Sequence, residues 1–310
     1  MFSSRRTRHG LIVAVFVVAV VVFVGFFTID DGEDKSLSTT QFIIVPNISN
    51  MVRPFRQYRE EYVVAPHYHL ASCQIEKVMT TLKDGIFCYL FAPDAFVAAN
   101  RTISEEKWST RFCSHKKHFR RNMSDVLQAI GNESVLFAVI RHPIDRFLSA
   151  YLDKCIMETY WDTAPQNICF GCEDDIHCIV NELQTLLHSN KNQTTLEFYY
   201  GRHFAPQTWY CDFDHFLDKY VIIKYGSDKE GITAMADQFD ALFQQVGVTQ
   251  EERAVIKMEI LKGSTFHSTH SLEEVQKLKE RVFADKMLLR KLYEIYFYDF
   301  MVFNFSAPEI

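Results

Sequence analysis

The stretch Val135-Leu-Phe-Ala-Val-Ile-Arg-His-Pro-Ile-Asp-Arg-Phe-Leu-Ser-Ala-Tyr151 decides the fold of this chain. Its first six residues form an unbroken apolar run, which is typical of a strand buried on both faces of a sheet. Pro143 suits the first turn of a helix, where the missing N–H has no intrahelical partner. Apolar residues then recur at helical spacing: Ile144, Phe147, Leu148, Tyr151, Leu152 and Cys155. The stretch therefore predicts a strand, a tight turn and a helix in an α/β fold.

Three polar residues of this stretch predict an anion site. Arg141 falls at the carboxyl end of the strand, where open α/β sheets gather their ligands. Arg146 and Ser149 are three residues apart on the helix and share a face. Two guanidinium groups and a hydroxyl near a helix N-terminus favour phosphate binding. The alternative is that the arginines are only surface salt-bridge partners.

The N-terminal region predicts a membrane anchor. Residues 11–29 run for nineteen positions without a charge, about the length that crosses a bilayer. Arginines precede this run and acidic residues follow it, so the positive-inside rule keeps residues 1–10 in the cytosol. A cleaved signal peptide is the alternative. We expect a stem over residues 30–61 and one lumenal domain over residues 62–310.

The lumenal part has the features of a secreted glycoprotein. Its eight cysteines form an even number, which favours disulfides in an oxidising compartment. The cluster Cys169, Cys172 and Cys178 could instead bind zinc with His177 or Cys155, and the pairing cannot be read from sequence. Six N-glycosylation sequons follow the anchor, at Asn47, Asn100, Asn122, Asn132, Asn192 and Asn304.

The net charge of -6 argues against a nucleic-acid partner. One local basic group could receive a sulfated or carboxylated glycan, or could be a solvated helix face. It comprises Lys107, Arg111, His115, Lys116, Lys117, His118, Arg120 and Arg121. The oligomeric state is left open.

A second change from strand to helix is expected between Val63 and Leu82. Val63 and Val64 indicate a strand, and the spacing of Ile75, Val78, Met79 and Leu82 predicts an amphipathic helix from about Gln74. The turn lacks the glycines of a Walker loop, so it gives no support to nucleotide triphosphate hydrolysis. The polar residues at its mouth are His69, Ser72, Cys73 and Lys77.

Together the two stretches resemble the Golgi carbohydrate sulfotransferases of chondroitin type. Residues 141–151 match that family's 3'-phosphate motif, approximately Arg-Asp-Pro-Phe-x-Arg-Leu-x-Ser-Ala-Tyr. The match implies that Arg141 and Ser149 contact the 3'-phosphate of 3'-phosphoadenosine 5'-phosphosulfate. Residues 69–78 lie on the 5'-phosphosulfate motif, approximately Lys-Val-Gly-Cys-Thr-Asn-Trp-Lys-Arg-Val, which implies Lys77 beside the phosphosulfate. His69 replaces the family's lysine, so it is a weaker cation, a base, or simply a changed position.

Two further segments are similar to elements of the same family. Residues 203–211, His-Phe-Ala-Pro-Gln-Thr-Trp-Tyr-Cys, resemble its His-Trp-x-Pro-Gln-x-x-x-Cys element, and residues 296–303 resemble its closing Tyr-x-x-Asp-x-x-x-Phe. The segments Cys88-Tyr-Leu-Phe and Cys169-Phe-Gly-Cys172 resemble the nematode branch of this family more than its vertebrate members.

The resemblance implies a P-loop-like sulfotransferase fold, with a mostly parallel sheet flanked by helices, in a single-pass type II Golgi membrane protein. The implied reaction is sulfate transfer to a glycan without a metal. The favoured acceptor is chondroitin, at the 4-position of N-acetylgalactosamine, and terminal glycoprotein sugars are the alternative. Histidine titrates near working pH, so His203 is the first candidate for the general base and His69 another. His267 and His270 follow, and His203 could instead be structural.

Two other readings of the chain stay open. A catalytically weak or inactive sulfotransferase-like protein could use this fold only to bind glycan, and His69, Ser72 and Glu76 at family motif positions favour it. A nucleotide-sugar glycosyltransferase would share the membrane topology but needs an Asp-x-Asp metal site. The sequence Asp212-Phe-Asp214 is the one formal match, and it follows Cys211 in a family-like segment.

Overall fold

The computed structural model describes residues 48–106, 111–113, 118–131, 134–160, 167–189, 193–263 and 272–310. The chain divides into two compact units, Met1–Val45 and Pro46–Ile310, and every described residue belongs to the second. The expected cytosolic tail, the expected anchor at residues 11–29 and most of the expected stem lie outside the described residues. Among the helices in the described ranges, none has the length and apolar character that a membrane span requires.

A sheet of five strands in the order β3-β1-β2-β4-β5 organises the second unit. β2 pairs in parallel with β4 and β4 with β5, whereas β1 pairs antiparallel with both β2 and β3. The sheet is therefore mixed, and the prediction of a mostly parallel sheet is wrong at this edge. β1 and β2 are joined only by the short 3-10 helix Pro66–Tyr68, a connection that fits a hairpin and is too short for a parallel crossover. The strands are β1 (Tyr62–Ala65), β2 (Leu70–Cys73), β3 (Phe119–Arg120), β4 (Val135–Ile140) and β5 (Tyr220–Lys224).

The structure confirms the strand, turn and helix predicted for the first stretch. β4 ends at Ile140 and α5 (Pro143–Tyr151) begins with the expected proline. The predicted helix continues beyond Tyr151 as a π-helix, Leu152–Ile156, rather than as regular α-helix. β4 lies between β2 and β5 and is almost wholly buried, which explains its unbroken apolar run.

The prediction that a helix begins near Gln74 is wrong. The chain instead forms β2, a loop over residues 74–79, and then α1 (Thr80–Phe91). Lys77 and Met79 have left-handed φ angles of 65° and 45°, which a helix cannot contain. Ile75 and Val78 are nevertheless fully buried, so the apolar spacing reflected a buried turn.

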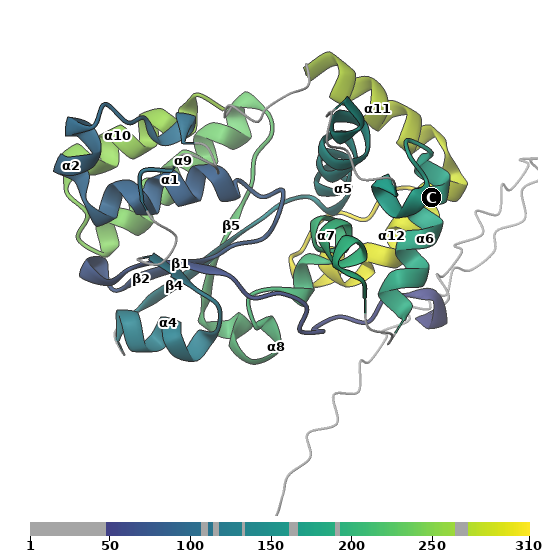
Figure 1. Ribbon diagram of the computed structural model, residues 1–310, viewed down its shortest axis with the longest axis horizontal. Coiled ribbons are helices and arrows are strands. Elements are labelled where there is room, and N and C mark those ends of the chain that lie inside the picture. Colours follow the sequence, from purple (N-terminus) through teal and green to yellow (C-terminus); the bar gives the residue numbers. More distant parts are fainter. Residues whose placement is uncertain are drawn as a thin grey trace, which may run out of the picture. The chain divides into compact units, whose positions relative to one another are not determined.

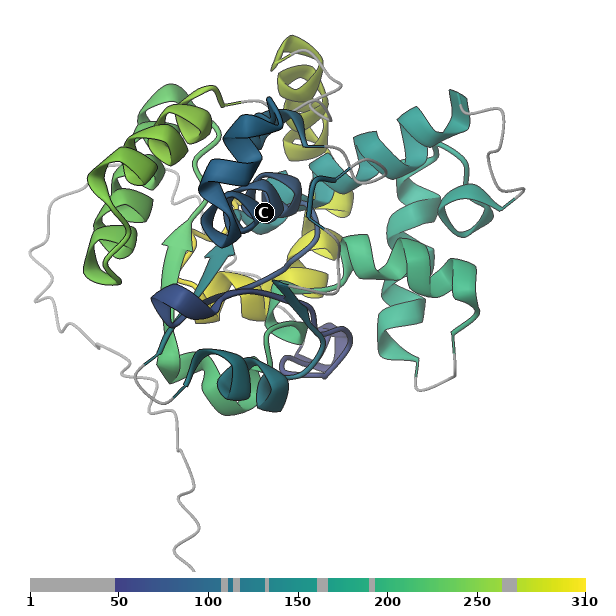
Figure 2. The ribbon, with the colours of Figure 1, turned by 60° about the vertical axis from the view of Figure 1, so that its left-hand side comes forward.

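Helices cover both faces of the sheet (Figures 1 and 2). α1, α9 and α10 lie on one face and α4 on the other, while α5, α6, α7, α11 and α12 gather to one side of the sheet. The remaining α-helices are α2 (Pro93–Ala98), α4 (Met123–Ile130), α6 (Ile176–His188), α7 (Thr195–Phe204), α8 (Phe213–Phe216), α9 (Lys229–Gln245), α10 (Gln250–Leu261), α11 (Leu272–Ala284) and α12 (Lys286–Val302). Other 3-10 helices span Ile48–Asn50, Ile103–Glu105, Met157–Tyr160, Ile168–Gly171, Gln207–Trp209 and Leu217–Lys219.

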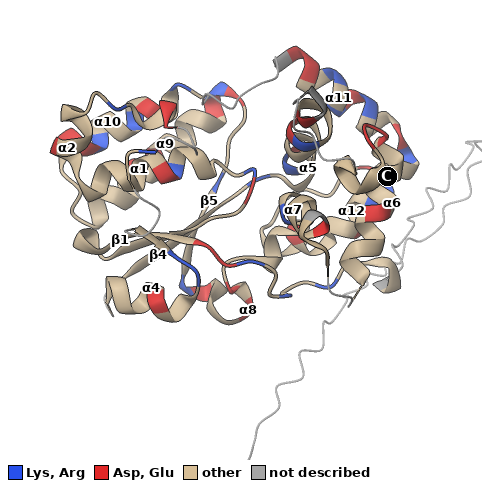
Figure 3. Ribbon diagram, in the orientation of Figure 1, with Lys and Arg blue, Asp and Glu red and all other residues tan. Residues whose placement is uncertain are grey.

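The central strands form an uncharged core. β1, β2 and β4 contain no Lys, Arg, Asp or Glu, and charged residues lie on the helices, the connecting segments and the ends of the edge strands β3 and β5 (Figure 3). The core also reaches into the region expected to be stem, since Met51 and Val52 are buried there. The Tyr58 N–H donates to the Trp209 carbonyl at 3.2 Å. The folded unit thus begins before residue 62, because isolated apolar residues anchor this mostly polar segment.

All eight cysteines are paired in disulfides, as the even count predicts. The zinc alternative for the cysteine cluster is wrong, because no thiol is left to bind a metal. The pairs are Cys73–Cys211, Cys88–Cys113, Cys155–Cys169 and Cys172–Cys178.

Candidate active site

Arg141 presents an incompletely paired guanidinium at the carboxyl end of β4. Its Nη1 donates to the Lys77 carbonyl at 3.2 Å, and its guanidinium lies 4.7 Å from the ring centre of Tyr225. The buried Nε has no hydrogen-bond partner among the described residues. Burial lowers the pKa of Arg141, and its attraction to Asp145 does not offset this cost. A bound anion would supply the missing partner.

Arg146 occupies a different environment and is only 1% exposed. Its Nε donates to the Glu76 carbonyl at 2.8 Å and its Nη1 to the Ala205 carbonyl at 2.7 Å. The guanidinium therefore joins the 74–79 loop to the end of α7. Backbone carbonyls accept from its Nε and Nη1, whereas its buried Nη2 has no hydrogen-bond partner among the described residues.

Ser149 lies on the least buried stripe of α5. Most of this helix is buried, whereas Asp145 and Ser149, four residues apart, are only partly covered. Asp153 continues the same side of the chain into the π-helix, and its carboxylate lies 2.9 Å from the Lys77 ammonium. Ser149 is thus on the side of α5 that carries a partner of Lys77.

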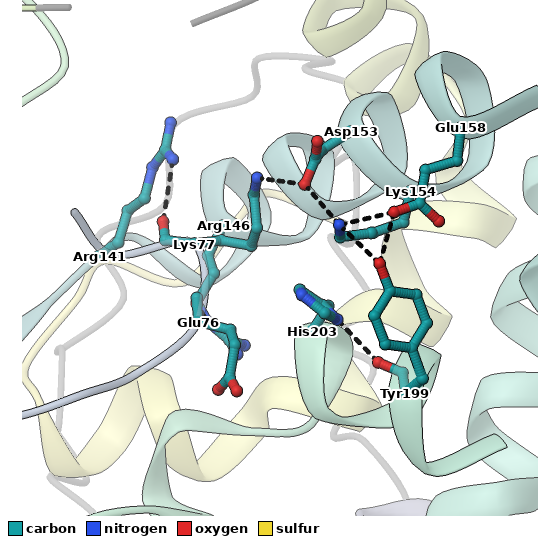
Figure 4. A network of polar contacts seen from close by, with 9 residues as sticks. All are labelled: Glu76, Lys77, Arg141, Arg146, Asp153, Lys154, Glu158, Tyr199 and His203. Atoms are coloured by element: carbon teal, nitrogen blue, oxygen red, sulfur yellow. Dashed lines mark hydrogen bonds and ion pairs between the residues drawn. The ribbon is translucent and has the colours of Figure 1, made fainter. Parts of the chain in front are cut away.

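Lys77 begins a chain of polar contacts (Figure 4). Asp153 lies between Lys77 and Lys154, with its Oδ2 at 2.9 Å and 3.2 Å from the two ammonium nitrogens. Burial alone would raise the pKa of Asp153, but the two lysines lower it to about 2. Burial lowers the pKa of Lys77 despite this partner. Asp153 consequently holds the Lys77 ammonium in place, while the Lys77 carbonyl accepts from Arg141.

The same chain of contacts continues to α7. Lys154 lies 2.7 Å from Glu158 and 3.0 Å from the Tyr199 hydroxyl, which itself donates to Glu158 at 2.5 Å. Sequence analysis missed Asp153, Lys154, Glu158 and Tyr199. The spacing of Lys154 and Glu158, four residues apart, was the one available signal of a charge pair.

His203 lies next to this network and has one nitrogen available for chemistry. Its Nδ1 is 2.7 Å from the Tyr199 carbonyl oxygen, which can only accept, so Nδ1 carries the proton. No hydrogen bond to Nε2 is found within the described ranges, and Figure 4 shows this nitrogen on the side of the ring facing Lys77. Burial, followed by the charges of Lys154 and Arg202, lowers the pKa of His203 well below 6.5. His203 is therefore a neutral imidazole with a free lone pair, as a general base requires.

The other residues predicted at this site lie elsewhere or are already occupied. His69 is at the amino end of β2, where its Nδ1 lies 2.6 Å from the Ile130 carbonyl, so β2 separates it from the loop. The Ser72 hydroxyl is buried and contacts the Lys83 ammonium at 3.3 Å. Cys73 is disulfide-bonded to Cys211 and offers no thiol. His267 and His270 lie outside the described residues.

Part of the predicted basic group has a structural role. Arg111 and His118 both contact the buried carboxylate of Asp84 on α1. Burial, with Arg111 nearby, lowers the pKa of His118 to about 4, so this imidazole is neutral. Lys107, His115, Lys116 and Lys117 lie outside the described residues.

Comparison with known proteins agrees with this geometry. Residues 60–306 match the family described as the sulfotransferase family. The chain belongs to this family. A cationic turn beside a neutral base is what a sulfotransferase needs, because the transferring group is anionic and the attacking hydroxyl must lose a proton.

Three relatives of this sulfotransferase come from Caenorhabditis elegans. Carbohydrate sulfotransferase chst-1 is 33% identical over 84% of this chain and 80% of its own length. The uncharacterized protein C18B2.2 is 30% identical over 85% of this chain and 74% of its own. The putative sulfotransferase vep-2 is 32% identical over 69% of this chain and 67% of its own. No solved structure matches the chain significantly.

Proposed function

We propose that this protein transfers the sulfuryl group of 3'-phosphoadenosine 5'-phosphosulfate to a hydroxyl group of a carbohydrate. Membership of the sulfotransferase family supports the donor class, and the likeness to a carbohydrate sulfotransferase supports the acceptor class. The observation that carries the proposal is the unpaired Nε of Arg141, whose Nη1 contacts the Lys77 carbonyl on the neighbouring loop, together with the free Nε2 of His203.

The chain's own groups fit such a donor. Arg141 has an unpaired buried N–H, and Ser149 lies on the least buried side of α5, so the two residues are suited to the 3'-phosphate. Lys77 carries positive charge on the loop that follows β2 and is suited to the 5'-phosphosulfate. Arg146 serves this site indirectly, by fixing the loop through the Glu76 carbonyl.

His203 would accept the proton of the attacking hydroxyl. In the transfer, a bond forms between the acceptor oxygen and sulfur while the bond between sulfur and the 5'-phosphate oxygen breaks. The acceptor proton goes to His203 Nε2, which is available because the Tyr199 carbonyl holds the proton of Nδ1 on the other side of the ring. Lys77 would balance negative charge on the transferring group.

We also propose chondroitin, at the 4-position of N-acetylgalactosamine, as the acceptor, and the Golgi lumen as the compartment. The acceptor follows from the motif resemblance. Eight disulfide-bonded cysteines support an oxidising compartment, and the apolar run at residues 11–29 supports a single-pass type II anchor.

Transfer of radiolabelled sulfate tests these proposals. The purified full-length chain is incubated with labelled donor and with desulfated chondroitin, dermatan or heparan, beside the Arg141→Ala variant. Label should enter chondroitin first and be lost with Arg141→Ala. Label in another glycan would reject the chondroitin assignment, and donor binding without transfer to any glycan would indicate a sulfotransferase-like binding protein instead.

His203→Gln tests the base separately. General acid–base catalysis contributes about 10²- to 10⁴-fold, so kcat should fall by that order while the affinity for the donor stays within about threefold. Equal kcat in the variant and the wild type would remove His203 from the mechanism.

A further inference from the structure

The backbone of Arg141 is hydrogen-bonded to the buried side chain of Gln207. The Gln207 Oε1 accepts the Arg141 backbone N–H at 2.8 Å, and the Gln207 Nε2 donates to the Arg141 carbonyl at 2.8 Å. Gln207 is fully buried. Its amide therefore pairs with both backbone groups of Arg141, in the way a neighbouring strand would, one residue beyond the end of β4.

A carboxylate from the C-terminal helix holds Gln207 in turn. Asp299 on α12 is fully buried and accepts the backbone N–H groups of Gln207 at 2.7 Å and Thr208 at 2.9 Å. The same carboxylate lies 3.5 Å from the Gln207 side-chain nitrogen. Three segments distant in sequence thus meet in one hydrogen-bonded row that ends at Arg141.

The guanidinium of Arg141 is less constrained than its backbone. Within the described part of the chain, its side chain has a single hydrogen bond, to the Lys77 carbonyl, and it contacts the Tyr225 ring. The direction of its free Nε depends on where the backbone places it. A displacement of about 1 Å in a binding group can cost on the order of 100-fold in activity.

We infer that Gln207 and Asp299 are positioning residues, which aim the Arg141 guanidinium at the 3'-phosphate of the sulfate donor. The inference rests on the proposed function. Affinity for the 3'-phosphate would then depend on two residues that do not contact the donor. We call the row of hydrogen bonds from Asp299 on α12 through the side-chain amide of Gln207 to the Arg141 backbone the relay.

Calorimetric binding of two nucleotides to the full-length chain tests this relay. Adenosine 3',5'-bisphosphate carries the 3'-phosphate and adenosine 5'-monophosphate lacks it, so the ratio of their affinities isolates the contribution of the 3'-phosphate contacts, which are assigned to Arg141 and Ser149. Gln207→Glu keeps an acceptor for the Arg141 N–H but loses the donor to its carbonyl. Asp299→Asn keeps the shape of the carboxylate and removes its charge. Each variant should lower the ratio about 10- to 100-fold, with affinity for the monophosphate within about threefold of wild type.

Glu259→Gln is the matched control, because Glu259 is also a buried carboxylate that accepts a backbone N–H, from Ser104 at 3.0 Å, on α10. It should leave the ratio unchanged even if it lowers the melting temperature. Relay variants that weaken both nucleotides equally, or neither, would overturn the inference and leave the proposed function standing. A wild-type chain that does not distinguish the two nucleotides would overturn the donor assignment and the relay together.

Discussion

Replacing Arg146 should destabilise the fold more than replacing Arg141. In Arg146→Met the apolar part of the side chain remains, but the bonds to the Glu76 and Ala205 carbonyls, at 2.8 and 2.7 Å, are lost. Hydrogen bonds to charged groups contribute ~1.5–3 kcal/mol each, so the pair contributes ~3–6 kcal/mol. The variant also avoids the cost of burying a charge, which favours the lower end, about 3 kcal/mol. By the same values, Arg141→Met loses one 3.2 Å bond and one ring contact, or about 2 kcal/mol at the lower end.

Urea unfolding followed by circular dichroism measures both free energies, and calorimetry with adenosine 3',5'-bisphosphate measures binding. The two variants should rank in opposite order: Arg146→Met loses more stability and Arg141→Met loses more nucleotide affinity. A loss below about 1 kcal/mol for Arg146→Met, or an equal loss for Arg141→Met, would refute the assignment of Arg146 to structure.

Three further outcomes are expected. Because burial lowers the pKa of His203 well below 6.5, kcat/KM should stay level from pH 8 down through pH 6.5; a drop centred on pH 6.5 would contradict this base. Burial lowers the pKa of Lys83 to about 7, so the unfolded chain binds more protons above that pH and the free energy of unfolding should rise by about 2 kcal/mol from pH 7 to pH 9. Lys83→Met should abolish this rise in urea titrations, and an unchanged rise would exclude Lys83 as its source. Replacing Cys73 and Cys211 by alanine opens a loop of 138 residues and should cost about 5 kcal/mol of stability, measured by urea unfolding; a loss under about 1 kcal/mol would contradict the loop-entropy argument.

The parts of the fold that sequence analysis predicted correctly are encoded locally. β4 and α5 could be found because an apolar run, a proline and a change of period lie within seventeen consecutive residues. β2 is only four residues long, and the loop after it has left-handed residues at Lys77 and Met79. That loop is held by the distant Arg146, so no local pattern could distinguish it from the start of a helix.

The polar network around His203 depended on contacts between segments far apart in sequence. Asp153 and Lys154 reach Lys77 and Tyr199 only because the π-helix after α5 packs against the loop and α7. Short π-helical segments in α-helices are often found at functional sites, and they leave no clear periodic pattern in the sequence. His203 could still be proposed as a base from its residue type, but its tautomer requires the position of the Tyr199 carbonyl.

The distinction between Arg141 and Arg146 shows what decides the role of an arginine at a strand end. The two residues are five positions apart, one at the end of β4 and one on α5, and their residue type makes each a candidate for binding an anion. Arg146 points into a buried region where two backbone carbonyls accept from its Nε and Nη1, while its Nη2 has no hydrogen-bond partner among the described residues. Arg141 has one carbonyl partner, an aromatic ring and an unpaired N–H, while its backbone is fixed by Gln207. Arg141 therefore differs from Arg146 in being less buried and in having one carbonyl partner instead of two, so its guanidinium can bind an anion with less reorganisation.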